Sequence, residues 1–229
     1  MIIIILGGIG SGKSVTATKF MKNSRYHSFC NFNMRSDNTM RIKKADIIEK
    51  NVKEVLRTGR EVYEYVINWD FWNAAKDRYG DFNIVLDEVH NLVHSRQSTT
   101  KWNTLMSMWI SQIRKVIGDS ERTHVVLLSQ KIARIDVAFR DLAHKIIVCH
   151  KFETDRRIMT PVISNGRRDK VFIPVTYIIQ YHFTGTNAVA KHEMFTNGMK
   201  TYDYRTMYLA NPYFQYYDSY ELFGETDYL

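Results

Sequence analysis

The chain has few of the features that mark secreted or membrane-spanning proteins. Its two cysteines, Cys30 and Cys149, are too few and too far apart in sequence for a disulfide framework or a zinc site. Both lie in apolar, strand-like runs, so we expect buried thiols and a reducing, intracellular setting. The longest apolar run, Ile2–Leu6, is far short of the roughly 20 residues that a membrane helix needs. No basic segment precedes it and no cleavage site follows it, so we expect neither a signal peptide nor a transmembrane segment.

Composition and charge are those of an ordinary globular protein. Hydrophobic residues make up 45% of the chain and charged residues 24%, so disorder is not expected. The 32 basic residues exceed the 24 acidic ones, which gives a formal net charge of +8. This excess favours a polyanionic partner, either nucleic acid or a membrane surface, although solubility alone would also account for it.

Short apolar runs alternate with helical patterns along the first 150 residues. Buried strands are predicted at Ile2–Leu6, His27–Phe32, Phe82–Leu86, Thr123–Leu128 and Lys145–His150. Helices are predicted at Lys13–Lys22, Arg41–Leu56, Asp70–Tyr79, Lys101–Ile117 and Ala138–Ala143. The alternation predicts an α/β fold, a three-layer sandwich whose central sheet is mostly parallel.

The pattern changes after residue 150. Two short apolar segments flank Asn165-Gly166, a dipeptide typical of a β-hairpin turn, and residues 201–229 are rich in tyrosine. We therefore expect a core at residues 1–150 and a C-terminal extension at residues 151–229. The extension should contain β-structure and pack on the core rather than form an independent domain.

The loop after the first predicted strand has the pattern of a phosphate-binding loop. Gly7–Ser14 satisfies G-x-x-x-x-G-K-[ST] in full and lies between a buried strand and a helix, as this pattern requires. Backbone N–H groups at a helix start favour phosphate, Lys13 can reach the β- and γ-phosphates, and the Ser14 hydroxyl can ligate magnesium. The predicted cofactors are thus ATP and Mg²⁺, in a P-loop NTPase fold of the RecA/ASCE-like kind. The expected nucleotide-binding residues are Gly8, Ile9, Gly10, Ser11, Gly12, Lys13, Ser14 and Val15.

Acidic and amide side chains follow two other predicted strands. Asp87 ends the strand Phe82–Leu86 and can hold the magnesium shell, and Glu88 beside it can act as a general base on the attacking water. The alternative for Glu88 is a solvated acid at a strand end. Gln130 follows the strand at 123–128, where an amide can touch both the γ-phosphate and the lytic water. The acidic pair favours hydrolysis over phosphoryl transfer to a small molecule, whose kinases need no second acid, and disfavours a non-catalytic nucleotide switch.

With these motifs the sequence resembles the FtsK/HerA-type branch of P-loop motor ATPases. The stretch His124–Lys151 carries the resemblance together with Gly7–Ser14 and Phe82–His90, over roughly two-thirds of the chain. Within that branch it is most similar to the Zot-like and viral genome-packaging ATPases, also in its ending Asn211–Glu221. The resemblance implies a sheet in which the strand before Gln130 lies between the two nucleotide-binding strands.

The resemblance also implies a ring-forming, DNA-translocating ATPase that receives an arginine from the neighbouring subunit. Arg122 and Arg114 rank above Arg140 for that arginine, and each could equally be an ordinary surface charge. The implied partners are double-stranded DNA, further copies of the chain in a pentamer or hexamer, and capsid vertex or portal proteins. The implied location is the host cytoplasm or the packaging vertex of a virion.

Two further patterns in the sequence have the composition of binding sites. The basic residues that flank the expected hairpin turn could neutralise DNA phosphates, or could form a solvated face: Arg156, Arg157, Arg167, Arg168 and Lys170. His90 and His94 have the spacing of a metal pair, but the pattern H-E-x-x-H is missing, and we expect no zinc there.

Three functions remain open at this point. Packaging of a viral genome is favoured over the Zot-like alternative, virion assembly and extrusion, because those relatives usually carry a membrane helix. A small-molecule P-loop kinase is the less favoured third.

Overall fold

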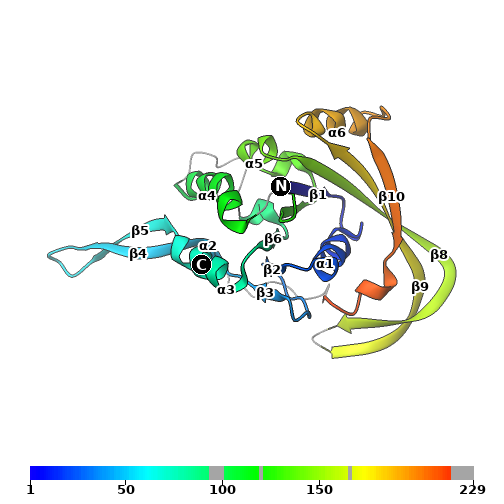
Figure 1. The fold of residues 1–229 in the computed structure, drawn as a ribbon, viewed down its shortest axis with the longest axis horizontal. Coiled ribbons are helices and arrows are strands. Elements are labelled where there is room, and N and C mark those ends of the chain that lie inside the picture. Colours follow the sequence, from blue (N-terminus) through cyan, green and yellow to red (C-terminus); the bar gives the residue numbers. More distant parts are fainter. Residues whose placement is uncertain (93–100, 119–120, 165–166, 218–229) are drawn as a thin grey trace.

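The computed structural model describes residues 1–92, 101–118, 121–164 and 167–217. Its centre is an eight-stranded sheet with the order β10-β9-β8-β1-β7-β6-β2-β3 (Figure 1). The strands are β1 Ile2–Leu6, β2 His27–Cys30, β3 Thr39–Arg41, β6 Phe82–Leu86, β7 Val125–Ser129, β8 Lys145–Ser164, β9 Arg167–Thr184 and β10 Tyr204–Leu209. The helices are α1 Lys13–Asn23, α2 Lys44–Ile47, α3 Trp69–Tyr79, α4 Lys101–Ile117, α5 Val137–Asp141 and α6 Ala188–Thr196. Short 3-10 turns follow β6, β7 and β10 at Val89–Asn91, Ile132–Arg134 and Asn211–Tyr213.

The middle of the sheet is parallel. The six strands β3, β2, β6, β7, β1 and β8, in their order across the sheet, are all parallel. β9 is antiparallel to β8, and β10 is antiparallel to β9. β7 lies between β1 and β6, which confirms the expected strand order. Leu6 pairs with Ser129, so the loop after β1 and the residue Gln130 leave the sheet at the same level. The predicted α/β fold with a mostly parallel sheet is therefore confirmed.

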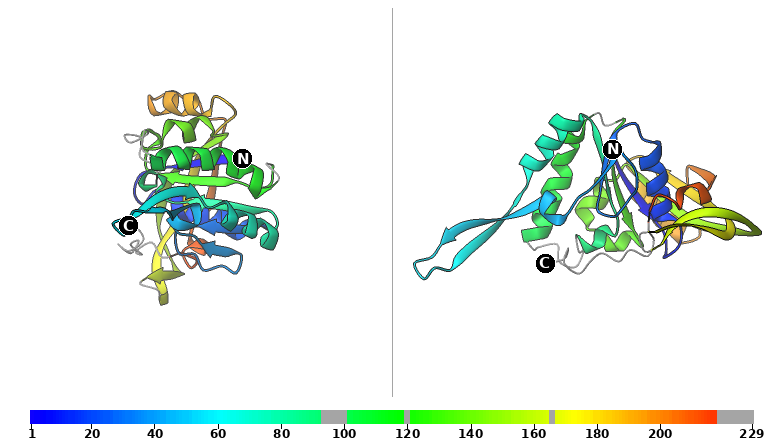
Figure 2. Two further views of the ribbon diagram at one scale, coloured as in Figure 1. Left: turned by 90° about the vertical axis from the view of Figure 1, so that its left-hand side faces the viewer. Right: turned by 90° about the horizontal axis from the view of Figure 1, so that it is seen from below.

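Each face of the sheet buries its own apolar layer. Helices cover both faces of the sheet (Figure 2). Along β1, Ile2 and Ile4 pack with residues of α3, α4 and α5, whereas Ile3 and Ile5 pack with residues of α1. The first layer is centred on Trp72 and Trp109, both fully buried, with ring centroids 5.6 Å apart. Consecutive strand residues point to opposite faces, so five consecutive apolar residues supply both layers.

The helix predicted at Arg41–Leu56 is wrong. Only α2 is helical there, and the chain then forms a hairpin of β4, Ile48–Val55, and β5, Glu61–Ile67, which projects from the body (Figure 1). Val52 and Val55, which suggested a buried helical face, are 51% and 59% exposed. Because the two strands pair only with each other, local β-propensity and the turn at Thr58-Gly59 decide the structure, and no core selects a helix.

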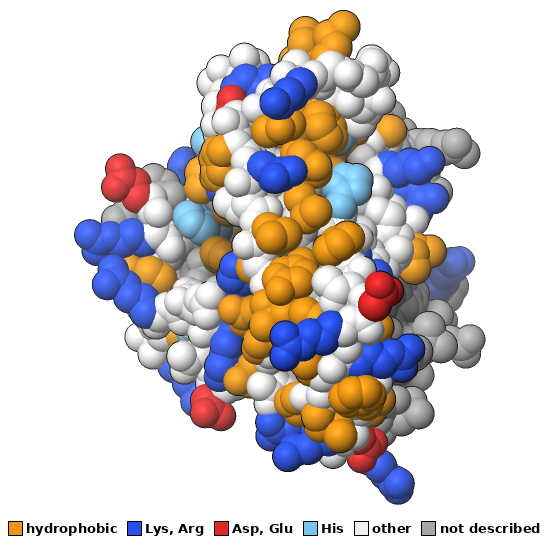
Figure 3. All heavy atoms as spheres, turned by 90° about the vertical axis from the view of Figure 1, so that its right-hand side faces the viewer, with side chains coloured by type: hydrophobic (Ala, Val, Ile, Leu, Met, Phe, Trp, Pro, Cys, Tyr) orange, Lys and Arg blue, Asp and Glu red, His pale blue; other side chains and the backbone are white. Residues whose placement is uncertain are grey.

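The strands after residue 145 continue the core sheet. β8 continues without a break past residue 150, and β9 and β10 are added to the same sheet next to β8. The turn expected at Asn165-Gly166 lies outside the described residues. One face of the molecule carries an apolar strip with Lys and Arg side chains beside it (Figure 3). On the β8–β9–β10 part of the sheet, Phe152 pairs with Tyr177 and Met207 pairs with Ile179, which puts them on one face, and they are 52% and 60% exposed. Among the described helices, none is long and apolar enough to cross a membrane.

The two cysteines are buried and free, as expected. Burial raises the pKa of Cys30 to about 12 and that of Cys149 to about 11. At pH 8 almost no thiolate forms at either position, and the thiolate is the reactive species. We therefore expect iodoacetamide to leave both unmodified in the native protein and to label both in guanidinium chloride, measured by intact mass. Labelling of native protein at the rate of an exposed thiol would contradict this burial.

Candidate functional site

The loop between β1 and α1 has a backbone that requires glycine at two positions. Gly7 has φ of 153°, and a Cβ there would lie 2.3 Å from Ser11 Oγ. Gly12, with φ of 95°, directly precedes α1, and its Cβ would lie 2.2 Å from Ile178 Cδ1 of β9. A side chain at either position would meet both a steric clash and a left-handed backbone. The two glycines thus fix the loop against β8 and β9.

Lys13 points back into this loop. Its ammonium group donates to Gly7 O at 2.8 Å and to Gly8 O at 3.0 Å, and the side chain is buried. The ammonium charge is therefore held beside the backbone of the glycine-rich loop.

Asp87 is joined to the loop through Ser14. The Ser14 hydroxyl donates to Asp87 Oδ2 at 3.1 Å, across 73 residues of sequence. Asn31, just past β2, holds the backbone of Asp87 from both sides, since its side chain donates to Asp87 O at 2.9 Å and accepts from Asp87 N at 2.7 Å. Burial raises the pKa of the Asp87 carboxyl above its usual value. The sequence did not indicate Asn31, because the predicted strand extends to Phe32, whereas β2 ends at Cys30.

The oxygens of Ser14 and Asp87 fit a magnesium ion. Mg²⁺ is usually held by one or two protein oxygens together with phosphate oxygens and water. Within the described parts of the chain, no group of three or more His, Cys, Asp and Glu side chains could hold a metal. The hydroxyl of Ser14 and the carboxylate of Asp87 would supply two ligands to a Mg²⁺ ion, and the phosphates of a bound nucleotide and water would supply the others. His94 of the histidine pair lies outside the described residues.

Glu88 follows Asp87 in a backbone conformation that is rare for its residue type. Its φ is 47°, and no other non-glycine residue among those described has a positive φ. The Glu88 N–H donates to Asp87 Oδ1 at 2.7 Å. Gln130 approaches from β7 and donates to Glu88 Oε1 at 3.5 Å, while Arg134 donates to Gln130 Oε1 at 3.1 Å. Asp87, Glu88 and Gln130 therefore meet at one edge of the sheet, and Arg134 joins them although the sequence did not suggest it.

A cleft of about 690 Å³ opens beside the loop. One wall is formed by Ile9–Val15, Asp87 and Glu88, which includes every predicted nucleotide-binding residue except Gly8. The opposite wall comes from β8, β9 and the segment after β10: Lys151, Glu153, Ile173, Pro174, Thr176, Ile178, Phe214 and Tyr217. Burial and then the neighbouring Asp87 raise the pKa of Tyr217. The C-terminal residues thus help to form the cleft, which the sequence did not indicate.

The three arginines expected to serve a neighbouring subunit lie away from this cleft. Arg122 is exposed and precedes β7, at the edge of the sheet opposite the phosphate loop. Arg114 lies at the same edge, near enough to His144 that its charge adds to burial in lowering the histidine pKa. Arg140 is half-buried in α5. None of the three lines the cleft of its own chain.

The basic residues considered for DNA contact are all exposed: Arg156, Arg157, Arg167, Arg168 and Lys170. The last three lie at the far end of the β8–β9 hairpin, where Arg168 donates a hydrogen bond to Gln215 Oε1. Arg156 and Arg157 lie nearer the cleft, since Arg157 pairs with Pro174 of the cleft wall.

A glycine-rich loop between a central strand and a helix, with an acid at the end of a second parallel strand, defines the fold as that of a P-loop NTPase. The sequence profile of the Zot (zonular occludens toxin) family matches residues 1–171, and the chain belongs to this family. No curated protein sequence matches it.

Solved structures resemble the chain at low sequence identity. The N-terminal domain of zonular occludens toxin from Neisseria meningitidis is 16% identical with a TM-score of 0.52, over 94% of this chain and 97% of that one. The genome packaging NTPase B204 of Sulfolobus turreted icosahedral virus 2, in complex with ATP-gammaS, is 13% identical with a TM-score of 0.41, over 68% and 76%. At 16% identity, the similarity to the N-terminal domain of zonular occludens toxin shows a shared fold alone.

Proposed function

We propose that the chain hydrolyses ATP with Mg²⁺ and uses the energy to move DNA. The observation that carries the proposal is the convergence of Lys13, the Ser14–Asp87 pair and the Glu88–Gln130 pair at one edge of the sheet. A site for binding alone needs the first two, whereas a general base and an amide beside it serve an attacking water. This arrangement favours hydrolysis over a small-molecule kinase or a nucleotide switch.

Each group has a distinct role in the proposed reaction. Lys13 neutralises charge on the β- and γ-phosphates, and Ser14 with Asp87 would hold the metal, which supplies further charge neutralisation on the phosphate oxygens when bound. Glu88 accepts the proton of the attacking water, and Gln130 orients that water through its bond to Glu88. Glu88 lines the cleft from a left-handed backbone conformation that is costly for a residue with a side chain, as residues at functional sites often do.

The proposed motor role rests on membership in the Zot family and on two surface features, the basic residues of the β8–β9 hairpin and the apolar strip. Membership in the Zot family gives more support to virion assembly and extrusion than to genome packaging at a capsid vertex or portal. The exposed cations of the β8–β9 hairpin suit the phosphates of double-stranded DNA. The apolar strip on β8, β9 and β10 suits contact between subunits of a ring, in which Arg122 or Arg114 would reach the neighbour's nucleotide. Such a motor would work in the host cytoplasm or at the virion.

The test combines turnover with assembly mass. We expect ATP hydrolysis to rise several-fold with double-stranded DNA, and the mass measured by light scattering in ATP to be a multiple of one chain. Replacing Arg156, Arg157 and Lys170 by alanine should abolish the stimulation and leave basal turnover unchanged, since these side chains do not line the cleft. If the rate of ATP hydrolysis at low salt were the same with and without DNA, the proposed DNA translocation would be rejected and only the ATPase activity would remain.

A further inference from the structure

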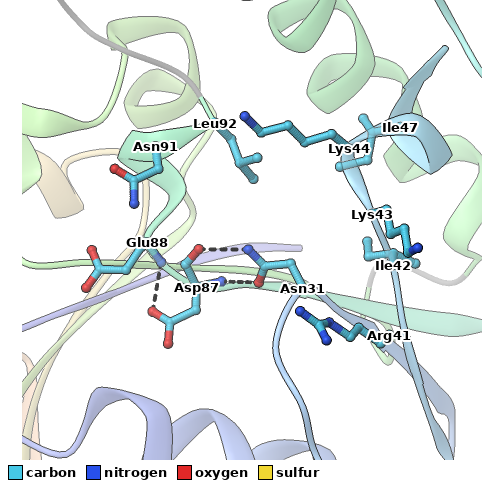
Figure 4. A pocket seen from close by; sticks show the side chains of 10 residues that line it. All are labelled: Asn31, Arg41, Ile42, Lys43, Lys44, Ile47, Asp87, Glu88, Asn91 and Leu92. Carbon is cyan, nitrogen blue, oxygen red and sulfur yellow. Dashed lines mark hydrogen bonds between the residues drawn. The ribbon is translucent and has the colours of Figure 1, made fainter. Parts of the chain in front are cut away.

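Arg41 stands at the active edge of the sheet, beside the acidic pair. It is the last residue of β3 and pairs across the parallel strands with Cys30, so it emerges next to Asn31. Asn31 is the residue that clamps the backbone of Asp87. Figure 4 shows the guanidinium group of Arg41 turned toward Asn31 and Asp87.

Arg41 lines two cavities at once. It belongs to the wall of the cleft that contains the phosphate loop, and also to the wall of a small cavity of about 40 Å³, whose lining Figure 4 shows. Among the described residues, the two cavities share Arg41, Asp87 and Glu88. Arg41 therefore lies beside the carboxylates of Asp87 and Glu88. The terminal phosphate of a bound nucleotide would have to fit between these carboxylates and Lys13.

The side chain is also held in place. Arg41 Nη1 donates to Asn33 Oδ1 at 3.1 Å, and Asn33 lines the same cleft. A guanidinium group presents its N–H donors in a planar fork that matches phosphate oxygens. Arg41 is exposed, and its hydrogen bond to Asn33 favours a position at the wall of the cleft.

We propose that Arg41 is a catalytic residue that contacts the γ-phosphate from within the same chain. The inference rests on the proposed ATP hydrolysis and adds a cation that the cleft would otherwise receive from a neighbouring subunit alone. A fixed guanidinium beside the transferring phosphoryl group stabilises the charge that develops on its oxygens. Each subunit then carries a basal hydrolytic activity of its own, and a neighbour's arginine adds to it.

Single-residue variants test the chemistry. Arg41→Ala should lower kcat by about 100-fold or more while the KM for ATP changes less than tenfold, because the contact strengthens in the transition state. Arg41→Lys should restore only part of the rate, since a point charge lacks the fork. Asn33→Ala is the matched control, which removes the hydrogen-bond partner of Arg41 and leaves the guanidinium present, and we expect a loss of less than tenfold.

Mixing two inactive variants tests whether Arg41 acts in its own chain. Lys13→Ala protein keeps Arg41, and Arg41→Ala protein keeps Lys13. If Arg41 served a neighbour, a mixture would regain turnover at sites formed between the two variants; we expect no recovery. Recovery, or a kcat for Arg41→Ala within twofold of wild type, would overturn the proposal. If Arg41→Ala does not fold, judged by its melting temperature, the Arg41→Lys rate decides in the same way. A wild-type chain without any ATP turnover would instead reject the proposed function itself.

Discussion

Replacing Glu88 by glutamine is expected to stop ATP hydrolysis while ATP still binds. The amide keeps the size of the side chain and can still meet Gln130, but it cannot accept the proton of the attacking water. General-base catalysis contributes about 10²- to 10⁴-fold, so turnover should fall by at least two orders of magnitude. Phosphate release measures the rate, and a fluorescent ATP analogue measures binding.

Two comparisons make the Glu88 result interpretable. Asp87→Asn should weaken Mg²⁺-dependent nucleotide binding, because this carboxylate contacts Ser14 and would hold the metal shell. Glu88→Gln should leave that binding within a factor of a few. If turnover of Glu88→Gln stayed within twofold of wild type, Glu88 would be a solvated strand-end acid and another group would have to activate the water.

Lys13→Ala is expected to abolish turnover through a different defect. The variant loses the charge proposed to face the β- and γ-phosphates, and it leaves Gly7 O and Gly8 O without the ammonium donor they have now. Both ATP affinity and the rate at saturating ATP should fall, the latter by about two orders of magnitude or more. Isothermal titration with a non-hydrolysable analogue, together with phosphate release, would separate the two effects.

Lys22→Ala is the matched control for Lys13. It removes a lysine from the same helix at an exposed position outside the cleft. Its binding and turnover should equal those of the wild type. Equal behaviour of the Lys13 and Lys22 variants would mean that the glycine-rich loop is not a phosphate site.

The parts of the site that were predictable are those carried by local pattern. A phosphate loop is a single continuous segment, and an acid after a buried strand can be seen without knowing what the strand pairs with. The position of Gln130 between the other two strands came from the resemblance, and β7 indeed lies between β1 and β6. Its contact with Glu88 then follows from the strand order.

The remaining parts depend on contacts that no local pattern encodes. Arg41 lies in the segment wrongly expected to be helical, which hid its place at the end of a strand beside Asn31. The hairpin that follows it is held by pairing between its own strands, where apolar spacing carries no information about a core. Phe214 and Tyr217 reach the cleft because β9 and β10 fold back along the sheet, a long-range arrangement that composition alone does not reveal.

The two walls of the cleft come from opposite ends of the chain, and this sets an order of events during synthesis. The phosphate loop leaves the ribosome some 200 residues before Tyr217. Until β7 and β8 have been made, β1, which lies between them, lacks both of its partner strands. The cleft is therefore complete only once residue 217 has been made, and a nucleotide that contacts both walls would stabilise the finished fold rather than its early intermediates.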